Sequence, residues 1–337
     1  MTIDQWKTAG GSRLGVSFEG GENAAVLPGL ARRADTAGAD TMWLASHLFQ
    51  RDPMVQATMA LSATTRINAA LMAISPYAVH PVHAAMAAAT LNEHFPGRAV
   101  LCLGAGAPGD MDAAGIARPR PVATLDEAIE ITRSLLAGEV VQFRGEHFRV
   151  SGRALETGAQ DVPLVLAATG PKMLQLAGRQ ADGVLLSAAT SIEFVRWSLA
   201  QVSEAANSAA GRQVRRIGLV FASVDADEGK AYERLKPLLA FVLRGAHHAA
   251  NLEMGGAKLD QTALYDAVTN DDWQRATALV SDEVVARHSV SGTPAQVRAR
   301  LGEYRQAGLD EVVIAGMRGE AMLAETLTAA LGDDPDK

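Results

Sequence analysis

A closed α/β barrel of eight parallel strands is the fold that this sequence predicts. Short apolar runs alternate with amphipathic helical patterns along the chain, in the order that parallel strands with crossover helices require. A glycine that can end a helix precedes an acidic strand start at Ala37–Asp40 and again at Ala307–Asp310. The 337 residues also suit one such barrel, because these barrels commonly run to ~250 residues or more.

Eight segments carry the pattern of a buried strand, and eight β/α repeats favour a closed barrel over an open sheet. The predicted strands are Arg13–Phe18, Asp40–Ala45, Arg66–Ser75, Arg98–Gly104, Pro163–Ala168, Asp182–Ser187, Arg215–Val224 and Leu309–Ala315. Helical patterns fill the gaps, for example at Ala24–Ala37, Val82–Glu93, Thr124–Leu136, Ile192–Ser208 and Ala295–Gln306.

Two segments are additions to this barrel. Glu139–Val150 alternates at period two around Arg144–Gly145, which predicts a β-hairpin inserted before strand five. Leu235–Ser291 carries helical patterns but no strand, which predicts a helical insertion between strands seven and eight. Insertions on the catalytic side of a barrel commonly enclose a substrate. We expect residues 1–337 to form a single domain.

Composition excludes several classes of protein. Apolar residues make up 48% of the chain without an uninterrupted apolar run of ~20, so we expect a soluble protein with a large core and no membrane contact. The N-terminus lacks the pattern of a secretory signal, and the single cysteine, Cys102, suits the reducing cytoplasm. A net charge of −7 with scattered Lys and Arg argues against nucleic-acid binding. The expected partner is a small-molecule substrate.

His47 is the first candidate for catalysis. It directly follows strand two, in WLASHLFQRD, and the carboxyl ends of barrel strands carry active sites. An imidazole there could transfer a proton near neutral pH, or it could simply cap the strand end or hydrogen-bond a loop. Asp52 precedes Pro53 and is expected to cap the next helix.

Strand three ends at a polar break. Ser75-Pro76-Tyr77 follows the strand and a helix restarts after His80-Pro81, so the last backbone groups would face the barrel mouth, where a flat ring could rest. His80 also fits a helix-start residue, and His83 fits a residue on the helix surface. Cys102 alternates with apolar neighbours and is expected in the core.

The segment Gly104–Gly109 matches the dinucleotide pattern G-x-G-x-x-G. That pattern needs a helix opening on the glycines and an acidic residue at the end of the next strand. Here Pro108 and a loop over Asp110–Pro121 intervene, so we reject a dinucleotide-binding fold. Small residues at this strand end would instead let a ligand approach the backbone closely.

A phosphate site is predicted after strand five, in AATGPKM. Thr169-Gly170 form a tight turn and Pro171 suits the first helical position, which leaves free N–H groups at a positive helix end beside Lys172. An ordinary turn between strand and helix would have the same sequence. The histidines of the insertion, His247, His248 and His288, lack the spacing of metal ligands, so we expect no metal site.

Five segments together resemble the luciferase-like superfamily of flavin and deazaflavin oxidoreductases. They are ASHLFQRD, MAISPYAVHP, GRAVLCLGAG, AATGPKMLQLAGRQADGVLL and SVSGTPAQVRARLGEYRQAGLDEVVI. The similarity covers nearly the whole chain and is strongest to methylenetetrahydromethanopterin reductases and deazaflavin-dependent dehydrogenases. Five motifs in the same order are specific to the superfamily but not to a substrate.

This resemblance implies a TIM barrel that binds coenzyme F-420 or FMN at the carboxyl ends of its strands, in a homodimer or higher homo-oligomer. It places a non-prolyl cis peptide at Met72-Ala73. The residues that it implies around the ring are Ser46, Met72, Ala73, Ser75, Ala105 and Gly106. Those implied at the phosphate are Thr169, Gly170, Lys172 and Met173, and His47 matches the family's active-site histidine.

The sequence departs from the family at two positions. The aspartate that commonly precedes the active-site histidine is Ser46, and the glutamate of the sugar-phosphate dehydrogenases is Ala107. The resemblance implies hydride transfer between coenzyme F-420 and a small organic substrate. The alternatives are an FMN-dependent monooxygenase that uses oxygen, and a flavin-binding barrel without turnover. The sequence does not identify the substrate.

Overall fold

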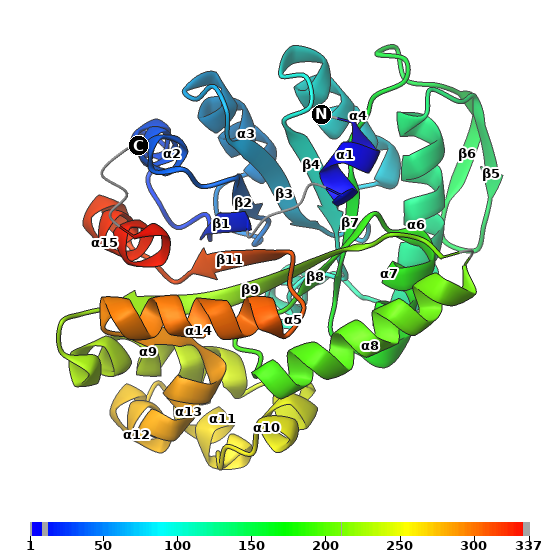
Figure 1. Ribbon diagram of the computed structural model, residues 1–337. Coiled ribbons are helices and arrows are strands. Elements are labelled where there is room, and N and C mark those ends of the chain that lie inside the picture. Colours follow the sequence, from blue (N-terminus) through cyan, green and yellow to red (C-terminus); the bar gives the residue numbers. More distant parts are fainter. Residues whose placement is uncertain (1, 9–12, 210, 333–337) are drawn as a thin grey trace.

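The computed structural model describes residues 2–8, 13–209 and 211–332, and it contains the predicted closed barrel (Figure 1). The barrel strands are β1 (Arg13–Phe18), β2 (Thr41–Ala45), β3 (Asn68–Ile74), β4 (Ala99–Leu103), β7 (Leu164–Ala168), β8 (Gly183–Leu186), β9 (Arg215–Val224) and β11 (Glu311–Ala315). Neighbouring strands pair in this order, and β11 closes the ring by pairing with β1. Every pairing in the ring is parallel, so all the carboxyl ends lie at one end of the barrel.

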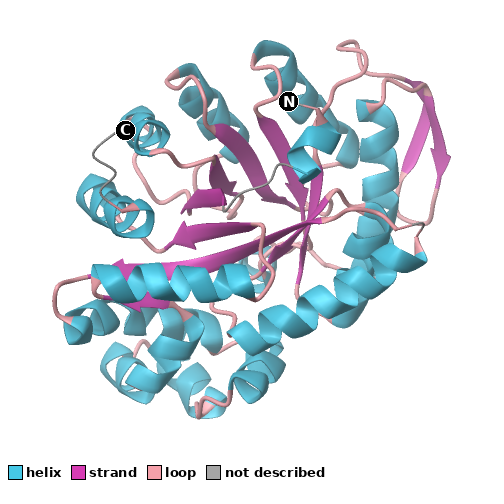
Figure 2. Cartoon of the chain, viewed as in Figure 1, coloured by secondary structure: helices cyan, strands magenta, loops and turns pink. Residues whose placement is uncertain are grey.

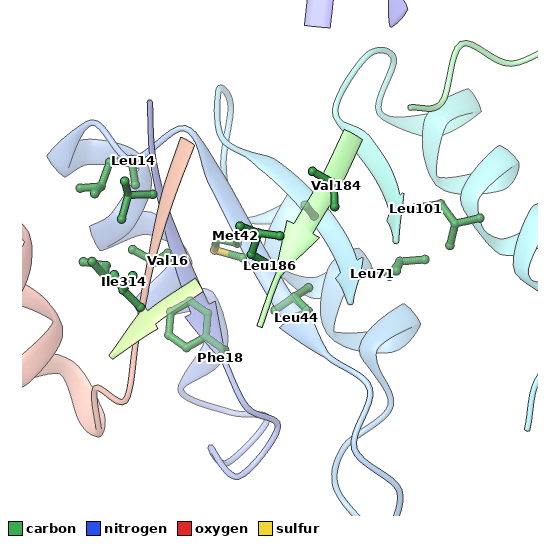
Figure 3. Packing of buried hydrophobic residues seen from close by; sticks show 14 of the residues in the cluster. Leu14, Val16, Phe18, Met42, Leu44, Leu71, Leu101, Val184, Leu186 and Ile314 are labelled. Carbon is green, nitrogen blue, oxygen red and sulfur yellow. The ribbon is translucent and has the colours of Figure 1, made fainter. Parts of the chain in front are cut away.

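Helices surround the strands, as Figure 2 shows. Those that follow the barrel strands are α2 (Leu27–Ala37), α3 (Pro53–Ser62), α4 (Pro81–His94), α6 (Pro121–Leu136), α7 (Pro171–Gln180), α8 (Ile192–Ser208), α14 (Pro294–Gln306) and α15 (Gly319–Leu331). The alternation of each strand sends one set of side chains outward, where Leu14, Val16 and Phe18 pack in the core beneath the helices (Figure 3). The other set fills the barrel interior, including Cys102.

The amino-terminal end of the barrel is closed by α1 (Ile3–Thr8), a short helix that the sequence pattern did not reveal. Its Trp6 is buried and lies against the guanidinium of Arg215, 4.7 Å from ring centroid to Cζ. Nη1 of Arg215 donates to the Trp6 carbonyl at 2.6 Å. A ligand therefore has its access at the opposite end, where the strands finish.

The predicted hairpin is present as β5 (Val141–Arg144) paired antiparallel with β6 (Arg149–Arg153). Its turn is fixed by Glu127 of α6, whose carboxylate accepts three backbone N–H groups, from Glu146, His147 and Phe148. The hairpin therefore packs onto the barrel helix that precedes it.

The helical insertion is present, but it begins at Glu228 instead of Leu235 and its last helix ends at His288 instead of continuing to Ser291. Its helices are α9 (Glu228–Leu243), the 3-10 turn η1 (Ala246–His248), α10 (Ala249–Gly255), α11 (Gln261–Thr269), α12 (Trp273–Leu279) and α13 (Asp282–His288). The expectation that residues up to Ser291 contain no strand is wrong, because β10 (Val290–Gly292) pairs with the far end of β9. β9 is ten residues long, so its last residues extend beyond the ring and are available to a ninth strand.

A second correction concerns the predicted loop over Asp110–Pro121, which begins with a short helix, α5 (Pro108–Ala113). Pro108 at its first position and Asp110 in its first turn are favourable helix-start residues. No helix in the described parts of the chain is both long and apolar enough to cross a membrane.

Candidate active site

His47 lies at the carboxyl end of β2, in a loop that is fixed at both ends. At the start of the loop, the N–H of Ser46 donates to the carbonyl of Met72 on the neighbouring strand. At its end, the Asp52 carboxylate caps α3 by accepting the N–H groups of Met54 and Val55 at 2.8 and 3.1 Å, as predicted. The loop therefore holds the imidazole at the barrel mouth.

The imidazole of His47 lies between two carboxylates. Its Nδ1 is 3.1 Å from Oδ2 of Asp110, and its Nε2 is 3.4 Å from Oε2 of Glu19. The three side chains are each between 31 and 42% exposed, so the group remains accessible to solvent and to a substrate. When both ring nitrogens donate to carboxylates, the ring carries its second proton.

The surroundings favour this charged form. The hydrogen bond and charge of Glu19, with those of Asp110, outweigh burial of the ring and raise the pKa of His47 from 6.5 to about 9. Glu19 contributes most to the shift, although the Asp110 contact is the shorter one. At neutral pH His47 is therefore an imidazolium that has a proton to donate.

Glu19 and Asp110 were not among the residues singled out from the sequence. Glu19 follows β1 directly and is held by Ser17, whose Oγ donates to Glu19 Oε1 at 2.8 Å. Its place just after a predicted strand end is a signal that could have identified it. Asp110 is positioned by α5, so the missed helix also concealed its role.

Asp110 is the acidic group nearest in sequence to the family glutamate position. That position is Ala107, which precedes α5 as its N-cap residue. One turn of helix then carries the Asp110 carboxylate to the imidazole. Although Ala107 stands at the position of the family glutamate, a carboxylate still contacts His47, and Asp110 supplies it.

A surface of small residues lies at the ends of β3, β4 and β7. A Cβ added to Gly104 would lie 2.8 Å from Cβ of Ala73 and 3.3 Å from Cβ of Ala167, so these three positions touch. The peptide bond Met72-Ala73 is cis, as predicted. No long side chain rises from these three positions, and we call them the small-residue floor.

The predicted residues Ser75, Ala105 and Gly106 lie together beside the small-residue floor. Oγ of the buried Ser75 donates to the carbonyl of Ala105 at 3.3 Å. Gly106 has φ of 85°, and a Cβ there would come within 2.0 Å of Cε of Met111. Glycine at this position is thus required both by the backbone conformation and by the packing of α5.

The predicted phosphate segment lies at the start of α7, which follows β7. Gly170 is the N-cap residue without a side-chain cap, and Pro171 opens the helix. A Cβ at Gly170 would meet nothing within 4 Å, so the space outside this turn is open. Gly170 and Lys172 are exposed, while Thr169 and Met173 are partly buried. Pro171 has no N–H and the N–H of Met173 donates to the Gly170 carbonyl at 3.0 Å, so the backbone N–H and the ammonium of Lys172 are the groups of this first turn that suit a phosphate.

Three other histidines have structural positions. His80 caps α4, with its Nδ1 accepting the N–H of Val82 at 3.2 Å, as expected of a helix-start residue. His248 and His288 are buried in the insertion, and burial lowers their pKa values to about 3 and about 4. Within residues 2–8, 13–209 and 211–332, no group of three His, Cys, Asp or Glu side chains has the geometry to hold a metal ion.

A family model and several known proteins match most of this chain. A family model described as luciferase-like monooxygenase matches residues 4–311. The chain is 32% identical over 310 residues to a 5,10-methylenetetrahydromethanopterin reductase of Archaeoglobus fulgidus, covering 89% of this chain and 92% of the relative. It is 26% identical over 307 residues to an F-420-dependent glucose-6-phosphate dehydrogenase of Kineococcus radiotolerans, covering 85 and 86% of the two chains.

A solved structure supports the fold. The coenzyme F-420-dependent tetrahydromethanopterin reductase of Methanopyrus kandleri superposes with a TM-score of 0.84 at 23% identity. The superposition covers 94% of this chain and 97% of that structure.

Proposed function

Because this chain belongs to the luciferase-like monooxygenase family, we propose that it transfers hydride between coenzyme F-420 and a small organic substrate. The chain is an oxidoreductase of the luciferase-like class. Coenzyme F-420 is favoured because the dehydrogenase of Kineococcus radiotolerans and the reductase structure of Methanopyrus kandleri are both described as F-420-dependent.

The small-residue floor is the observation that carries the proposal. A planar ring resting on Ala73, Gly104 and Ala167 would be supported by the ends of three neighbouring strands. The bound deazaflavin supplies the hydride chemistry, while the protein supplies orientation and electrostatics. Ser46, Met72, Ser75, Ala105 and Gly106 would line the ring, and the start of α7 would hold its phosphate.

His47 is assigned the proton transfer. Its imidazolium donates a proton to the substrate atom that gains negative charge as hydride arrives, and it recovers the proton in the reverse direction. Glu19 and Asp110 keep this proton on the ring at neutral pH. The two carboxylates also contact the two ring nitrogens, which fixes the orientation of the imidazole in the barrel mouth.

Equilibrium binding tests the cofactor. We expect the purified protein to bind oxidised coenzyme F-420 more tightly than FMN, measured by the change in fluorescence of each cofactor. Ala167→Leu should abolish binding, because the added side chain would occupy the floor. Val140→Leu, at an exposed position before β5, should leave binding unchanged.

The alternatives give different results. Tighter binding of FMN, with consumption of oxygen by the reduced complex, would identify the FMN-dependent monooxygenase that the family description makes the second candidate. Binding of either cofactor without reduction or oxidation by any tested alcohol, aldehyde or imine would indicate a flavin-binding barrel. Tight F-420 binding that Ala167→Leu leaves unchanged would place the ring elsewhere.

A further inference from the structure

The hairpin of β5 and β6 has one apolar face and one basic face, and Figure 1 shows it at the edge of the molecule beside α6. Side chains of a strand alternate between its two faces. Phe143 and Val150 point inward and pack with residues of α4 and α6. Their neighbours Arg144 and Arg149 point outward and are exposed. We call these two residues the arginine pair.

The two members of the arginine pair lie directly opposite each other in the antiparallel ladder. Side chains in such positions start from Cβ atoms roughly 5 Å apart, where like charges destabilise a hairpin. Neither guanidinium has an ion-pair partner among the described residues, because the one carboxylate of the hairpin, Glu146, is paired with Arg120 instead. The repulsion is therefore not relieved by the chain itself, although its acidic residues outnumber its basic ones, 38 to 31. A bound anion would relieve it.

The turn of the hairpin lies on the side of the barrel where the strands end. Each barrel helix runs back from the carboxyl end of its strand, so α4 and α6 begin near the ends of β3 and β4. Phe148 in the turn packs edge-on against the ring of His80, the N-cap residue of α4, with ring centroids 5.2 Å apart. Glu146 in the turn pairs with Arg120, the N-cap residue of α6. The arginine pair flanks this turn and therefore lies beside the strand ends that carry the small-residue floor.

We propose that the arginine pair binds the glutamate tail of coenzyme F-420, an inference that rests on the proposed function. Beyond its phosphate this cofactor carries a chain of linked glutamates, whose carboxylates are ionised at neutral pH. Guanidinium groups bind carboxylates through two parallel hydrogen bonds. A net charge of −7 makes most of the protein surface repel such a tail, so a local basic site is the place that can hold it. FMN ends at its phosphate and has no group for the arginine pair.

Helix α6 separates the arginine pair from the start of α7, where we place the cofactor phosphate. Strands β3, β4 and β7 are neighbours in that order, so α6 lies between α4 and α7. Asp126 of α6 accepts a hydrogen bond from Gln180 of α7 at 2.6 Å, which shows that the two helices are in contact. Packed helices lie roughly 8–10 Å apart, and an extended chain advances about 3.5 Å per residue. A few linked glutamates therefore reach past α6 to the arginine pair.

Equilibrium binding with two forms of the cofactor tests the proposal. Deazaflavin fluorescence measures the affinity of the protein for coenzyme F-420 with its glutamate chain and for the same molecule without glutamates. The wild-type protein should bind the tailed form roughly 10-fold more tightly at low salt, and added salt should reduce this difference by screening the charges. The double variant Arg144→Gln/Arg149→Gln should lose most of the difference and keep its affinity for the tail-free form.

A matched control and a stability measurement separate binding from other effects. Arg32→Gln/Arg179→Gln removes the same charge from two exposed positions on other helices and should bind both forms as the wild type does. Without cofactor, the hairpin double variant should melt no lower than the wild type, because it loses two like charges that face each other. Equal wild-type affinity for the two forms, or an equal loss in the control variant, would overturn the proposal and leave the proposed function in place. Failure of the wild type to bind either form would contradict the proposed function itself.

Discussion

Arg215 and Glu311 form an ion pair inside the closed end of the barrel, with Nη2 of the arginine 3.0 Å from Oε2 of the glutamate. Both side chains are buried, at 1 and 0% exposure. The other carboxylate oxygen of Glu311 accepts the indole N–H of Trp43 at 2.9 Å. Glu311 thus joins β11 to β2 and β9 through the barrel interior.

Glu311→Gln should destabilise the protein by roughly 3–5 kcal/mol, because Arg215 would remain as a buried, uncompensated charge. Glutamine keeps an acceptor for Trp43, so the loss reports on the charge alone. The exposed pair of Arg33 and Glu320 provides the control, and Glu320→Gln should cost less than about 1 kcal/mol. Urea unfolding measures both changes in the free energy of unfolding. Equal losses in the two variants would contradict the conclusion that burial makes the Arg215–Glu311 pair the more important one.

His47→Asn should lower turnover by roughly 100-fold, because the proton donor is lost, while the variant still folds and binds cofactor. The test is a comparison of steady-state rates and thermal unfolding for the two proteins. If the variant binds cofactor and turns over normally, His47 has a structural role and the proton comes from another group.

Asp110→Asn should shift the pH dependence of the reaction to lower pH. Removing this carboxylate lowers the pKa of His47 from about 9, so the decline in rate that follows loss of its proton should begin at a lower pH. Profiles of kcat/KM against pH measure the shift. Asp112→Asn, on the same helix, is the control and should leave the profile in place. Equal shifts in both variants would indicate a general charge effect.

Gly170→Val should weaken cofactor binding without destabilising the protein. The added Cβ meets no neighbour within 4 Å, and φ of −83° suits any residue, but the side chain would stand where an anion approaches the helix start. Lys172→Gln should weaken binding as well, by removing a positive charge. Arg179→Gln, in the last turn of the same helix, should have no effect. Unchanged cofactor affinity in both test variants would mean that the cofactor phosphate does not bind at the start of α7.

Acid should destabilise the helical insertion through His288. Its pKa is lowered to about 4 by burial, whereas the unfolded value is 6.5, so only the unfolded chain binds this proton between those two pH values. The contribution of His288 to the free energy of unfolding is therefore fully present above pH 6.5. It falls by about 1.4 kcal/mol per pH unit as the pH drops toward 4. His288→Gln keeps a donor for the Ala189 carbonyl and should show a smaller slope of stability against pH. An identical slope would exclude His288 as its source.

Strand positions were predictable because they depend on local pattern. Each of the eight predicted segments contains one barrel strand, with ends that differ by a few residues. The short elements α1, α5 and β10 were missed for one reason. The six residues of α1 and of α5 make fewer than two helical turns and show no helical periodicity, and β10 has only three residues, so the structure of these elements depends on what they pack against.

Part of the candidate site was predictable as well. His47, Ser75, Gly106 and Gly170 follow strand ends, and strand ends were visible in the sequence. The cis peptide at Met72-Ala73 came from the family resemblance alone and is present. Asp110 could not be predicted as a partner of His47, because it is 63 residues away in sequence and its helix, α5, was missed.

The sequence by itself determined which segments form strands and helices and which residues stand at the strand ends, since side-chain periodicity and helix-capping chemistry act over a few neighbouring residues. Only the tertiary structure decided that Glu19 and Asp110 meet the two nitrogens of His47, and that Ala73, Gly104 and Ala167 touch. Closure of the barrel sets those distances, because the register of parallel strands brings together ends that are far apart along the chain.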